Sequence, residues 1–378
     1  RRIQEIVDPD GLAIRRSWTY DANGNAVTST DARGQLTRYA YDAADRLVYT
    51  VDPLGYVRSS RYDAAGRVDL TIAYADAIDV AKLGMAISMD AVRALVSRDS
   101  IHDLRDYRVF DDDGRIVATV DGTGGVTRFW YDANGNVTLR KAYANRIDLG
   151  AWTEHTVPNP AADATRDRMQ VTVYDVLDRP VYTMDGTGAV VAQAYDANGN
   201  LLERVAYAER ISPKTVARVA EMQAALAGAA DAAYDRRERY AYDAAGRLAS
   251  TVDAMGAVTR RYHDANGNVV RQVVHAATVA AGSSAASVVA GSADRVSSMA
   301  YDAAGRMVFQ VDAMNAVTWQ AFDADGRVVE RTSLATALAK TPGLGASVAA
   351  LEAAVTEDAA LDRQVRYAYD AAGRRIYE

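Results

Sequence analysis

Residues 62–67 read Tyr-Asp-Ala-Ala-Gly-Arg, and close variants of this hexapeptide recur along the whole chain. Each copy, here called a cassette, starts with an aromatic residue, or once with histidine, followed by Asp and usually by two small residues. The twelve cassette aspartates are residues 21, 42, 63, 111, 132, 175, 196, 243, 264, 302, 323 and 370. A motif repeated this regularly indicates a chain built from stacked supersecondary units.

The end of each cassette has the composition of a tight turn. The third residue after the Asp is Gly in ten copies, with Asp45 and Asp178 in the other two, and the residue after that is Arg or Asn. An Asp side chain bonds to backbone amides just ahead of it, and Gly accepts the positive φ that a tight reversal requires. Asp also enters the left-handed region at low cost. Every cassette is therefore expected to be a turn.

A second turn motif, Asp-x-x-Gly, lies between the cassettes. It occurs at residues 8–11, 31–34, 52–55, 121–124, 185–188 and 253–256, and Asn315 replaces the Gly after Asp312. From Tyr41 to Asp52 is 11 residues and from Asp52 to Tyr62 is 10, which is about one strand and one reversal. The alternation of the two turns predicts an antiparallel β-meander.

The segments between turns have the composition of strands. Residues 47–51, 57–62, 126–131 and 307–311 are rich in Val, Thr and aromatic residues, with partial period-two alternation. Four cassettes carry Asn-Gly, at Asn23, Asn134, Asn198 and Asn266, which is a strong hairpin signal. The fold class expected is mainly β.

Longer insertions interrupt the meander after each pair of cassettes. Five are expected, over about residues 73–104, 142–168, 206–238, 274–294 and 332–364. The third predicts the clearest helix, with Ser212 as N-cap, Pro213 at the first helical position and Gly228 as its end; Val216, Val219, Met222 and Leu226 form its apolar stripe. Isolated helices of about 15 residues or fewer are marginal in water, so each helix is expected to pack on the neighbouring sheet.

The other insertions give weaker helical signals. The fifth has Val348, Leu351 and Val355 spaced three and four apart, and the first predicts a short helix from Ser88 with Val92, Leu95 and Val96 as its apolar residues. The second, with two prolines, and the fourth, rich in Ala, Ser and Gly, are expected to be loops.

Composition limits the possible functions. The 378 residues include no Cys, which excludes disulfides and thiolate chemistry. No apolar run is long enough to span a membrane, and the net charge of −7 argues against nucleic acid as a partner. Both ends of the sequence are in phase with the repeat, so one continuous array over residues 1–378, taken from a longer chain, is expected. No cofactor is expected.

The spacing of some polar residues permits a calcium hypothesis. Asp132, Asn134 and Asn136 have the spacing of oxygen ligands, but the glycine comes at the fourth place of the loop and Tyr143 stands at the twelfth. A hairpin turn is the favoured interpretation here and for the acidic run Asp111–Asp113. The four histidines, His102, His155, His263 and His275, match no metal-site spacing.

The aromatic residues have two possible roles. Twenty-two tyrosines against four Phe and four Trp could form a sugar-binding surface, or ladders in which each Tyr packs on its counterpart one repeat away. The ladder is the favoured interpretation. Trp18, Trp130, Trp152 and Trp319 are better candidates for a sugar platform because they fall outside the cassettes, although core packing is favoured for each.

No catalytic motif stands out from the repeat. Asp121-Gly122-Thr123-Gly124 superficially resembles an aspartic-protease motif or a phosphate loop, but other copies hold Pro-Leu or Ala-Met between Asp and Gly, which favours a turn. An active site built once would break the symmetry of the repeat, and none is apparent from the motifs. No catalytic, cofactor-binding or metal-binding residue is therefore assigned.

The cassette, followed by Val-Asp-x-x-Gly-x-Val-Thr and a new Tyr-Asp, resembles the YD or Rhs repeat. Copies at residues 62–67, 242–247, 301–306 and 369–374 match it best. The repeat positions assigned from this resemblance are Tyr20, Asp21, Tyr41, Asp42, Tyr62, Asp63, Gly66, Tyr131, Asp132, Gly135, Tyr174, Tyr195, Tyr242, Tyr301 and Tyr369.

The resemblance implies a long β-sheet wound into a spiral, shell or solenoid, as in Rhs polymorphic toxins, the B and C components of Tc toxins, and teneurins. It implies a non-enzymatic structural segment of a large secreted or cell-surface bacterial protein. Its partners would be flanking repeats and a C-terminal toxin domain that the array encloses or displays. Two alternatives stay open: an adhesin that binds glycans or proteins of a neighbouring cell, and a carbohydrate-active enzyme using two of the many aspartates.

Overall fold

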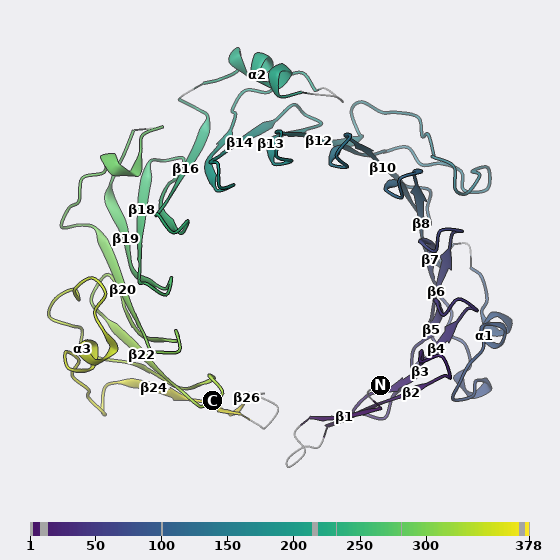
Figure 1. Ribbon diagram of the computed structural model, residues 1–378, viewed down its shortest axis with the longest axis horizontal. Helices are drawn as coiled ribbons and strands as arrows, with labels where there is room; N and C mark the ends of the chain where they lie inside the picture. Colours follow the sequence, from purple (N-terminus) through teal and green to yellow (C-terminus); the bar gives the residue numbers. More distant parts are fainter. Residues whose placement is uncertain are drawn as a thin grey trace. The chain divides into compact units, whose positions relative to one another are not determined.

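The computed structural model describes residues 3–7, 14–99, 101–213, 218–231, 233–280, 282–369 and 375–377. It contains two compact units, the first of residues 1–178 and the second of residues 179–213 and 218–378. Both consist mainly of β-strands joined by short turns (Figure 1). The predicted fold class, a mainly β antiparallel meander, is confirmed.

In the first unit each strand pairs antiparallel with the next along the chain. Its elements are β1 Gln4–Val7, β2 Ile14–Tyr20, β3 Ala26–Thr30, β4 Leu36–Tyr41, β5 Leu47–Val51, β6 Val57–Tyr62, β7 Val68–Ala73, the 3-10 helix η1 Val80–Lys82, α1 Met89–Leu95, β8 Leu104–Phe110, β9 Ile116–Asp121, β10 Val126–Tyr131, β11 Val137–Ala142 and β12 Arg168–Tyr174.

The second unit repeats this arrangement from β13 to β24, and β25 and β26 pair with each other in a separate two-stranded sheet. Its elements are β13 Pro180–Asp185, β14 Val190–Tyr195, β15 Leu201–Ala206, α2 Val219–Ala227, β16 Arg236–Tyr242, β17 Leu248–Val252, β18 Ala257–His263, β19 Val269–Thr278, η2 Ala285–Ser287, β20 Arg295–Tyr301, β21 Met307–Val311, β22 Val317–Phe322, β23 Val328–Ser333, α3 Val348–Glu352, β24 Arg363–Arg366, β25 Ala368–Tyr369 and β26 Arg375–Tyr377.

The predicted strands and turns are confirmed where the structure describes them. The four segments expected from composition are β5, β6, β10 and β21, with the same bounds. Asp45 and Asp178, which stand where other cassettes have Gly, each have a φ of 59°. The turn expected at residues 8–11 and the last cassette turn, at 370–374, lie outside the described residues.

A β-bulge precedes the aromatic residue of the cassettes, and the sequence did not predict it. In the pairing of β6 with β7, Arg61 lies opposite Leu70 and Tyr62 lies opposite Val68, so Asp69 has no partner. The same shift occurs before Tyr41, Tyr131 and Tyr301. A bulge re-aims side chains locally, and here it recurs with every turn of this kind whose pairing is described.

The five insertions lie where they were predicted, between β7 and β8, β11 and β12, β15 and β16, β19 and β20, and β23 and β24. In the first and fifth, Ser88 and Ser347 cap α1 and α3, each accepting a backbone N–H with its hydroxyl. The second contains turns and no helix, and in the described part of the fourth the one helical element is the short η2. An α-helix is therefore present in three of the five insertions, namely the first, third and fifth.

The predicted start of the third-insertion helix was wrong. The helix α2 begins at Val219 with Arg218 as N-cap, while Ser212 and Pro213 are not helical. The Arg218 backbone N–H donates to Glu221 Oε2 at 3.2 Å, which fixes the helix start there. The stripe residues Val219, Met222 and Leu226 are in α2, Gly228 ends it as predicted, and Val216 lies outside the described residues.

All five insertions open in the same way. The backbone N–H of Ile78 donates to the carbonyl of Gly55 at 2.8 Å, and the equivalent bonds recur 23 positions after the turn residue each time. The other four pairs are Ile147 with Gly124, Ile211 with Gly188, Val279 with Gly256, and Leu338 with Asn315. We call this bond the opening clamp. In the third insertion it ties Ile211, the residue before Ser212, to the turn residue Gly188.

All five insertions also close in the same way, through an aspartate that we call the closing Asp. Asp103, which is 4% exposed, accepts the N–H of Ala75 with one carboxylate oxygen and that of Asp99 with the other. The equivalents are Asp167, Asp235, Asp294 and Asp362. Burial tends to raise the pKa of Asp167, but the Ala144 amide and the Lys141 ammonium outweigh it and hold that pKa below its ordinary value.

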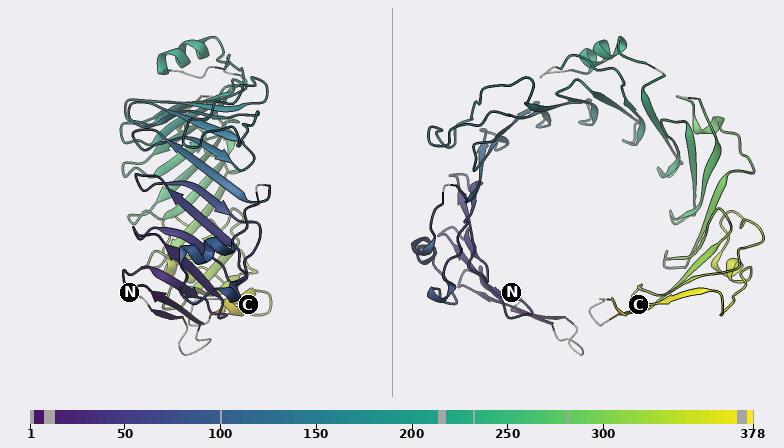
Figure 2. Two further views of the ribbon diagram at one scale, coloured as in Figure 1. Left: turned by 90° about the vertical axis from the view of Figure 1, so that its right-hand side faces the viewer. Right: turned by 180° about the vertical axis from the view of Figure 1, so that it is seen from behind.

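The cores lie between the sheets and the insertions. Val92 of α1 is fully buried against a cluster that includes Val51 and Val57, and Leu351 of α3 packs with Phe309 and Val311. Figures 1 and 2 show that within each unit the insertions lie on one face of the sheet. Helices this short depend on such burial, at about 1.5–3 kcal/mol for each large apolar side chain.

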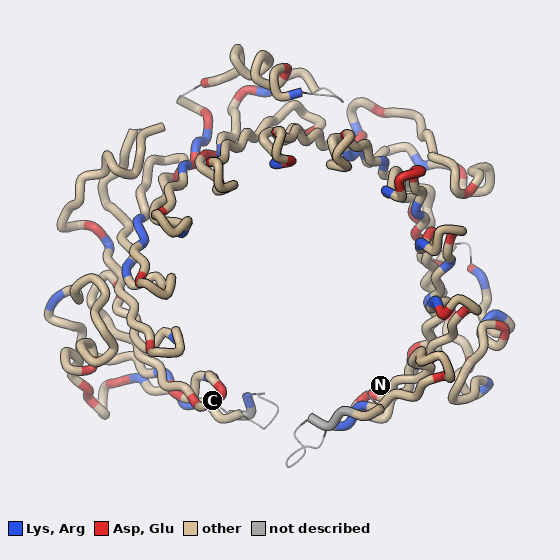
Figure 3. Tube along the Cα trace, viewed as in Figure 1, with Lys and Arg blue, Asp and Glu red and all other residues tan. Residues whose placement is uncertain are grey.

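Charges of both signs alternate along each unit, so neither carries a long basic stripe (Figure 3). Among the described residues no helix has both the length and the apolar character that crossing a bilayer requires.

Candidate functional site

The cassette turn at residues 62–67 shows why its residue types recur. Asp63 Oδ1 accepts the backbone N–H groups of Ala65 and Arg67, both at 2.9 Å, and the Gly66 N–H donates to the Asp63 carbonyl. Arg67 Nε donates to Asp63 Oδ2 at 2.7 Å. The Arg67 amide, against a smaller opposing effect of burial, lowers the pKa of Asp63. Gly66 has a φ of 81°, which favours glycine.

The cassette aromatic residue ties each turn to the preceding one. The Tyr62 hydroxyl donates to the Leu47 carbonyl at 2.8 Å, just after the previous cassette turn, and the Arg46 guanidinium of that turn lies 4.6 Å from the Tyr62 ring centre. The same hydroxyl bond to a backbone carbonyl is made by Tyr41, Tyr131, Tyr174, Tyr195, Tyr242, Tyr301 and Tyr369.

The cassette rings therefore stack on arginine side chains and not on the tyrosine of the next repeat, which was the favoured interpretation of the sequence. Arginines of the preceding cassette also lie over Phe110, Tyr131, Tyr195, Phe322 and Tyr369. In the described part of the chain the one close ring pair joins Tyr107 to Trp152, with centroids 5.4 Å apart. The ladder is thus one of alternating rings and guanidinium groups, held together by cation–π attraction.

The acidic stretches considered for calcium are turns. Asp132 Oδ1 accepts the N–H groups of Asn134 and Asn136, and its Oδ2 accepts the Asn136 side-chain amide. Asp111 pairs with Arg115, which also contacts Asp113 at 2.9 Å. Gly135, with a φ of 90°, completes the turn of Asp132. No group of three potential metal ligands is found among the described residues.

Asp45 and Asp178 have a role that the sequence did not reveal. Asn23 and Asn25 of the first cassette each donate a side-chain amide to Asp45 Oδ1, at 2.8 and 2.6 Å. Asn134 and Asn136 do the same for Asp178 at 2.8 and 2.7 Å. Asp therefore replaces Gly at two turns where the preceding cassette ends in Asn-Gly-Asn, and its carboxylate joins the two turns.

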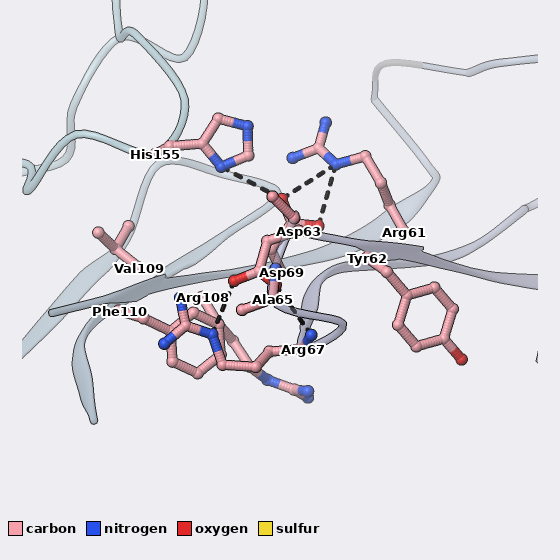
Figure 4. A pocket seen from close by; sticks show the side chains of 11 residues that line it. Arg61, Tyr62, Asp63, Ala65, Arg67, Asp69, Arg108, Val109, Phe110 and His155 are labelled. Atoms are coloured by element: carbon pink, nitrogen blue, oxygen red, sulfur yellow. Dashed lines mark hydrogen bonds and ion pairs between the residues drawn. The ribbon is translucent and has the colours of Figure 1, made fainter. Parts of the chain in front are cut away.

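A cluster of charged side chains in the first unit departs from the repeat. The Asp69 carboxylate, only 2% exposed, contacts Arg61 Nε at 3.1 Å and His155 Nδ1 at 3.2 Å. Arg61 Nη1 also pairs with Glu154 at 2.6 Å. Burial works to lower the pKa of Arg61, but hydrogen bonds to the two carboxylates raise it overall. Figure 4 shows Arg61 and His155 directed toward the cleft that these residues line.

The elements that build this cluster are far apart in sequence. Arg61 is the residue before the last of β6, and Asp69 is the bulge residue of β7. Glu154 and His155 belong to the second insertion, where His155 has a φ of 72°. The adjoining cleft has a volume of about 580 Å³ and is also lined by Arg67, Arg108 and Phe110. No Ser, Thr or Cys is among its described lining residues.

Two residues of the charge cluster depart from the common repeat in residue type. Asp69 is the only charged residue at the sixth position after a cassette Asp, where most copies have Val, and Arg61 is the only charged residue directly before a cassette aromatic. These two substitutions were visible in an alignment of the cassettes. Their partner His155 was not, because it follows 86 residues later within an irregular insertion.

The histidines and tryptophans lie apart. His102 contacts Asp99 at 2.6 Å, and the buried His275 contacts the closing Asp294 at 2.8 Å. Trp152 packs on Tyr107 and donates through Nε1 to the Thr156 carbonyl. Trp130 lies 4.8 Å from Arg128. Trp18 and Trp319 are half-buried.

Comparison with known proteins agrees with this geometry. The family model described as the RHS repeat matches residues 20–51 and 242–280. No curated protein matches the sequence.

Solved structures share the fold. The crystal structure of TcdB2-TccC3 has a TM-score of 0.60 and 15% identity over 96% of this chain, and this chain spans 16% of that one. The TcdB2-TccC3 structure without its hypervariable C-terminal region gives a TM-score of 0.58 at 15% identity, over 96% of this chain and 15% of that one. The RHS repeat match and the shared fold support the resemblance of this chain to the Rhs/YD-repeat family.

Proposed function

We propose that this chain is a non-enzymatic structural segment of a large bacterial Rhs/YD-repeat protein, secreted or at the cell surface, that helps to enclose or display a C-terminal toxin or effector. The observation that carries the proposal is the fastening of each cassette to the one before it. A tyrosine hydroxyl bond and an arginine stack recur at successive turns, as Tyr62 with Leu47 and Arg46 illustrates.

These contacts between successive cassettes suit a rigid sheet that encloses other polypeptide. A lone β-meander bends and slips in register, whereas bulges, buried closing aspartates and side-chain links at each turn fix the register of every strand. The insertions cover one face of the sheet in each unit and bury its apolar residues. The protein's own contribution is mechanical, because each repeat needs its neighbours to bury a core.

Limited proteolysis of the full-length protein that carries this chain tests the proposal. We expect the polypeptide downstream of the array to resist protease while the array is intact. A variant in which Tyr62, Tyr131 and Tyr301 are changed to Phe should expose that polypeptide faster, whereas Tyr56→Phe, an exposed tyrosine outside the cassettes, should not. Cleavage of the downstream polypeptide in the parent protein as fast as in the triple variant would contradict enclosure. Saturable binding of this chain to a glycan array would favour an adhesin instead.

A further inference from the structure

A cleft of about 470 Å³ lies beneath α1 in the first unit, and five arginines line it. Arg46 and Arg61 come from the strand side, Arg105 from β8, and Arg93 and Arg98 from α1 and the segment after it. Its volume lies within the range typical of small-molecule sites. Guanidinium groups gathered in one cleft predict an anionic occupant unless carboxylates of the protein already satisfy them.

Three of the five arginines form ion pairs at 3.1 Å or less. Arg46 pairs with Asp42 at 2.7 Å, Arg61 with Glu154 at 2.6 Å, and Arg93 with Asp90 at 3.1 Å. Arg98 has no ion-pair partner among the described residues. Arg105, 18% exposed in its side chain, donates through Nη2 to Asp103 Oδ2 at 3.4 Å and to the Asp99 carbonyl at 3.5 Å, but its buried Nε has no hydrogen-bond acceptor among the described residues. A buried donor left without an acceptor is costly, and an occupant with an oxyanion would supply that acceptor.

The repeat shows what is missing at Arg105. Arg237 holds the equivalent position, two residues after the closing Asp235, and pairs with Glu203 at 2.8 Å. The residue equivalent to Glu203 in the repeat of α1 is Leu70. The chain therefore keeps a guanidinium at Arg105 but lacks, on the neighbouring strand, a carboxylate like the one that pairs with Arg237, so that the one carboxylate Arg105 contacts among the described residues is that of Asp103, at 3.4 Å.

The equivalent cleft beneath α3 in the second unit has the opposite character. Counted from the first helical residue, Glu352 and Glu357 replace Arg93 and Arg98, and both line this cleft of about 380 Å³. Ala321 stands where the first unit has Arg61. The scaffold is thus the same in the two clefts, while the residues that face an occupant differ in charge.

We propose that the cleft beneath α1 binds a small molecule carrying a phosphate, sulfate or carboxylate group, held by the guanidinium groups of Arg98 and Arg105. Each guanidinium presents N–H donors in a planar fork that matches two oxygens of such a group. The cleft beneath α3, with glutamates at the equivalent positions, does not bind anions.

Isothermal titration of this chain with inorganic phosphate, sulfate and citrate, at constant ionic strength, tests the proposal and shows which group is preferred. We expect saturable binding of at least one anion, weakened roughly tenfold or more in Arg98→Gln/Arg105→Gln, because each charge-assisted pair contributes about 1.5–3 kcal/mol. Arg33→Gln removes the same charge from an exposed turn and should bind like wild type, as should Glu352→Gln/Glu357→Gln.

Two controls keep the outcome clear. Arg98 is exposed, so Arg98→Gln alone should fold, as circular dichroism will show, and should still weaken binding if Arg105→Gln does not fold. No saturable binding of any of the three anions, or equal weakening in Arg33→Gln and Arg98→Gln, would overturn the proposal. Neither result depends on whether the array encloses a toxin.

Discussion

At the scale of single residues, the cassette tyrosine hydroxyl is the simplest link to remove. Tyr131 donates to the Ile116 carbonyl at 2.7 Å, and burial, with the Asp111 carboxylate, raises the pKa of Tyr131. Tyr131→Phe keeps the ring over Arg115 but leaves the carbonyl unpaired, so we expect a loss of about 1 kcal/mol in the free energy of unfolding. Urea denaturation measures it. Tyr56→Phe should change stability by less than about 0.5 kcal/mol, and equal effects of both would contradict the role of the bond.

The link between the first two cassettes should appear as an energetic coupling. Asp45 accepts amides from Asn23 and Asn25 while its backbone has a φ of 59°. Asp45→Gly removes the link but relieves the backbone, and Asn25→Ala removes one donor. A double-mutant cycle of these two changes should give a coupling of roughly 0.5 kcal/mol, because residues in contact are not additive. A coupling indistinguishable from zero would show that the contact contributes nothing.

The pair of His102 and Asp99 should titrate abnormally. The hydrogen bond from His102 is the largest of the effects that lower the pKa of Asp99 from 3.8 to about 2, and the same bond raises the pKa of His102 above 6.5. Asp99, whose pKa is lowered, contributes stability that is fully present above the pKa of Asp99 in the unfolded chain. This stability is lost as the pH falls toward 2. His102, whose pKa is raised, contributes stability that is fully present below pH 6.5. This stability is lost as the pH rises through the pKa of His102 in the folded state. The pair is therefore fully formed between about pH 4 and 6.5.

An NMR titration of the His102 ring protons measures this shift. The midpoint should lie above 6.5 in the wild-type chain and move down in Asp99→Asn. An unchanged midpoint in the variant would rule out the pairing in solution.

Some residue roles followed from the sequence and others could not. Asp63 and Gly66 were predicted as turn residues because their chemistry acts within a few positions of the chain. The stacking of Arg46 on Tyr62 depends on the strand register and on a bulge, which local composition does not specify. The contact of Asp69 with His155 depends on how an irregular insertion folds back, so only the unusual charge at Asp69 could be read from the sequence.

At the scale of elements, the opening clamp predicts that equivalent glycines differ in their tolerance of a side chain. A Cβ at Gly55 would lie 2.2 Å from the Ile78 carbonyl oxygen, whereas a Cβ at Gly34 meets nothing within 4 Å. Both glycines have positive φ, so each Ala substitution should lower the free energy of unfolding by roughly 1 kcal/mol. Gly55→Ala should lower it by about 1–3 kcal/mol more, because the new Cβ displaces the insertion. Urea denaturation gives the difference. Hydrogen exchange should rise over residues 78–96 in Gly55→Ala alone; equal exchange in the two variants would contradict the clamp.

The charge cluster should be replaceable by the residues that other repeats use. Asp69→Val leaves Arg61 and His155 without their buried carboxylate and should cost about 1–2 kcal/mol, a small value because Arg61 is 41% exposed. Adding Arg61→Ala restores the common pattern and should recover most of that loss, as measured by thermal unfolding. Failure of the second change to recover stability would show that the cluster holds the second insertion by more than charge pairing.

The elements themselves were largely predictable. Strand bounds such as those of β6 and β10 follow from turns on both sides, so little freedom remains between them. The start of α2 was wrong because Ser212 and Pro213 carry a local capping signal, while the bond from Ile211 to Gly188 is a long-range constraint that overrides it. The closing aspartates follow a recurring pattern in which an Asp or Gly precedes them by three or four residues, which an alignment of the insertions would have revealed.

At the scale of the whole molecule, the repeating unit is larger than the cassette. Four strands and one insertion, with its opening clamp and closing Asp, recur together, and the clamp residues Gly124, Gly188, Gly256 and Asn315 mark equivalent points. The variation among copies is concentrated beneath the insertions, where the clefts of α1 and α3 carry opposite charges. A constant frame with variable clefts is consistent with a structural array that also presents binding sites.

The most direct test of equivalent, mutually fastened repeats is to remove one whole repeat and measure folding. Deleting residues 257–315 joins Gly256 to Ala316 and removes four strands with one insertion, so the direction of every remaining strand and the turn chemistry are kept. Deleting residues 257–305 instead removes three strands, so every strand after the deletion would run in the opposite direction to the one it has in the parent chain. We predict that the first variant gives the β-sheet circular dichroism spectrum and cooperative urea unfolding of the parent chain, and that the second does not. Loss of cooperative unfolding in both variants, or its retention in both, would contradict the account.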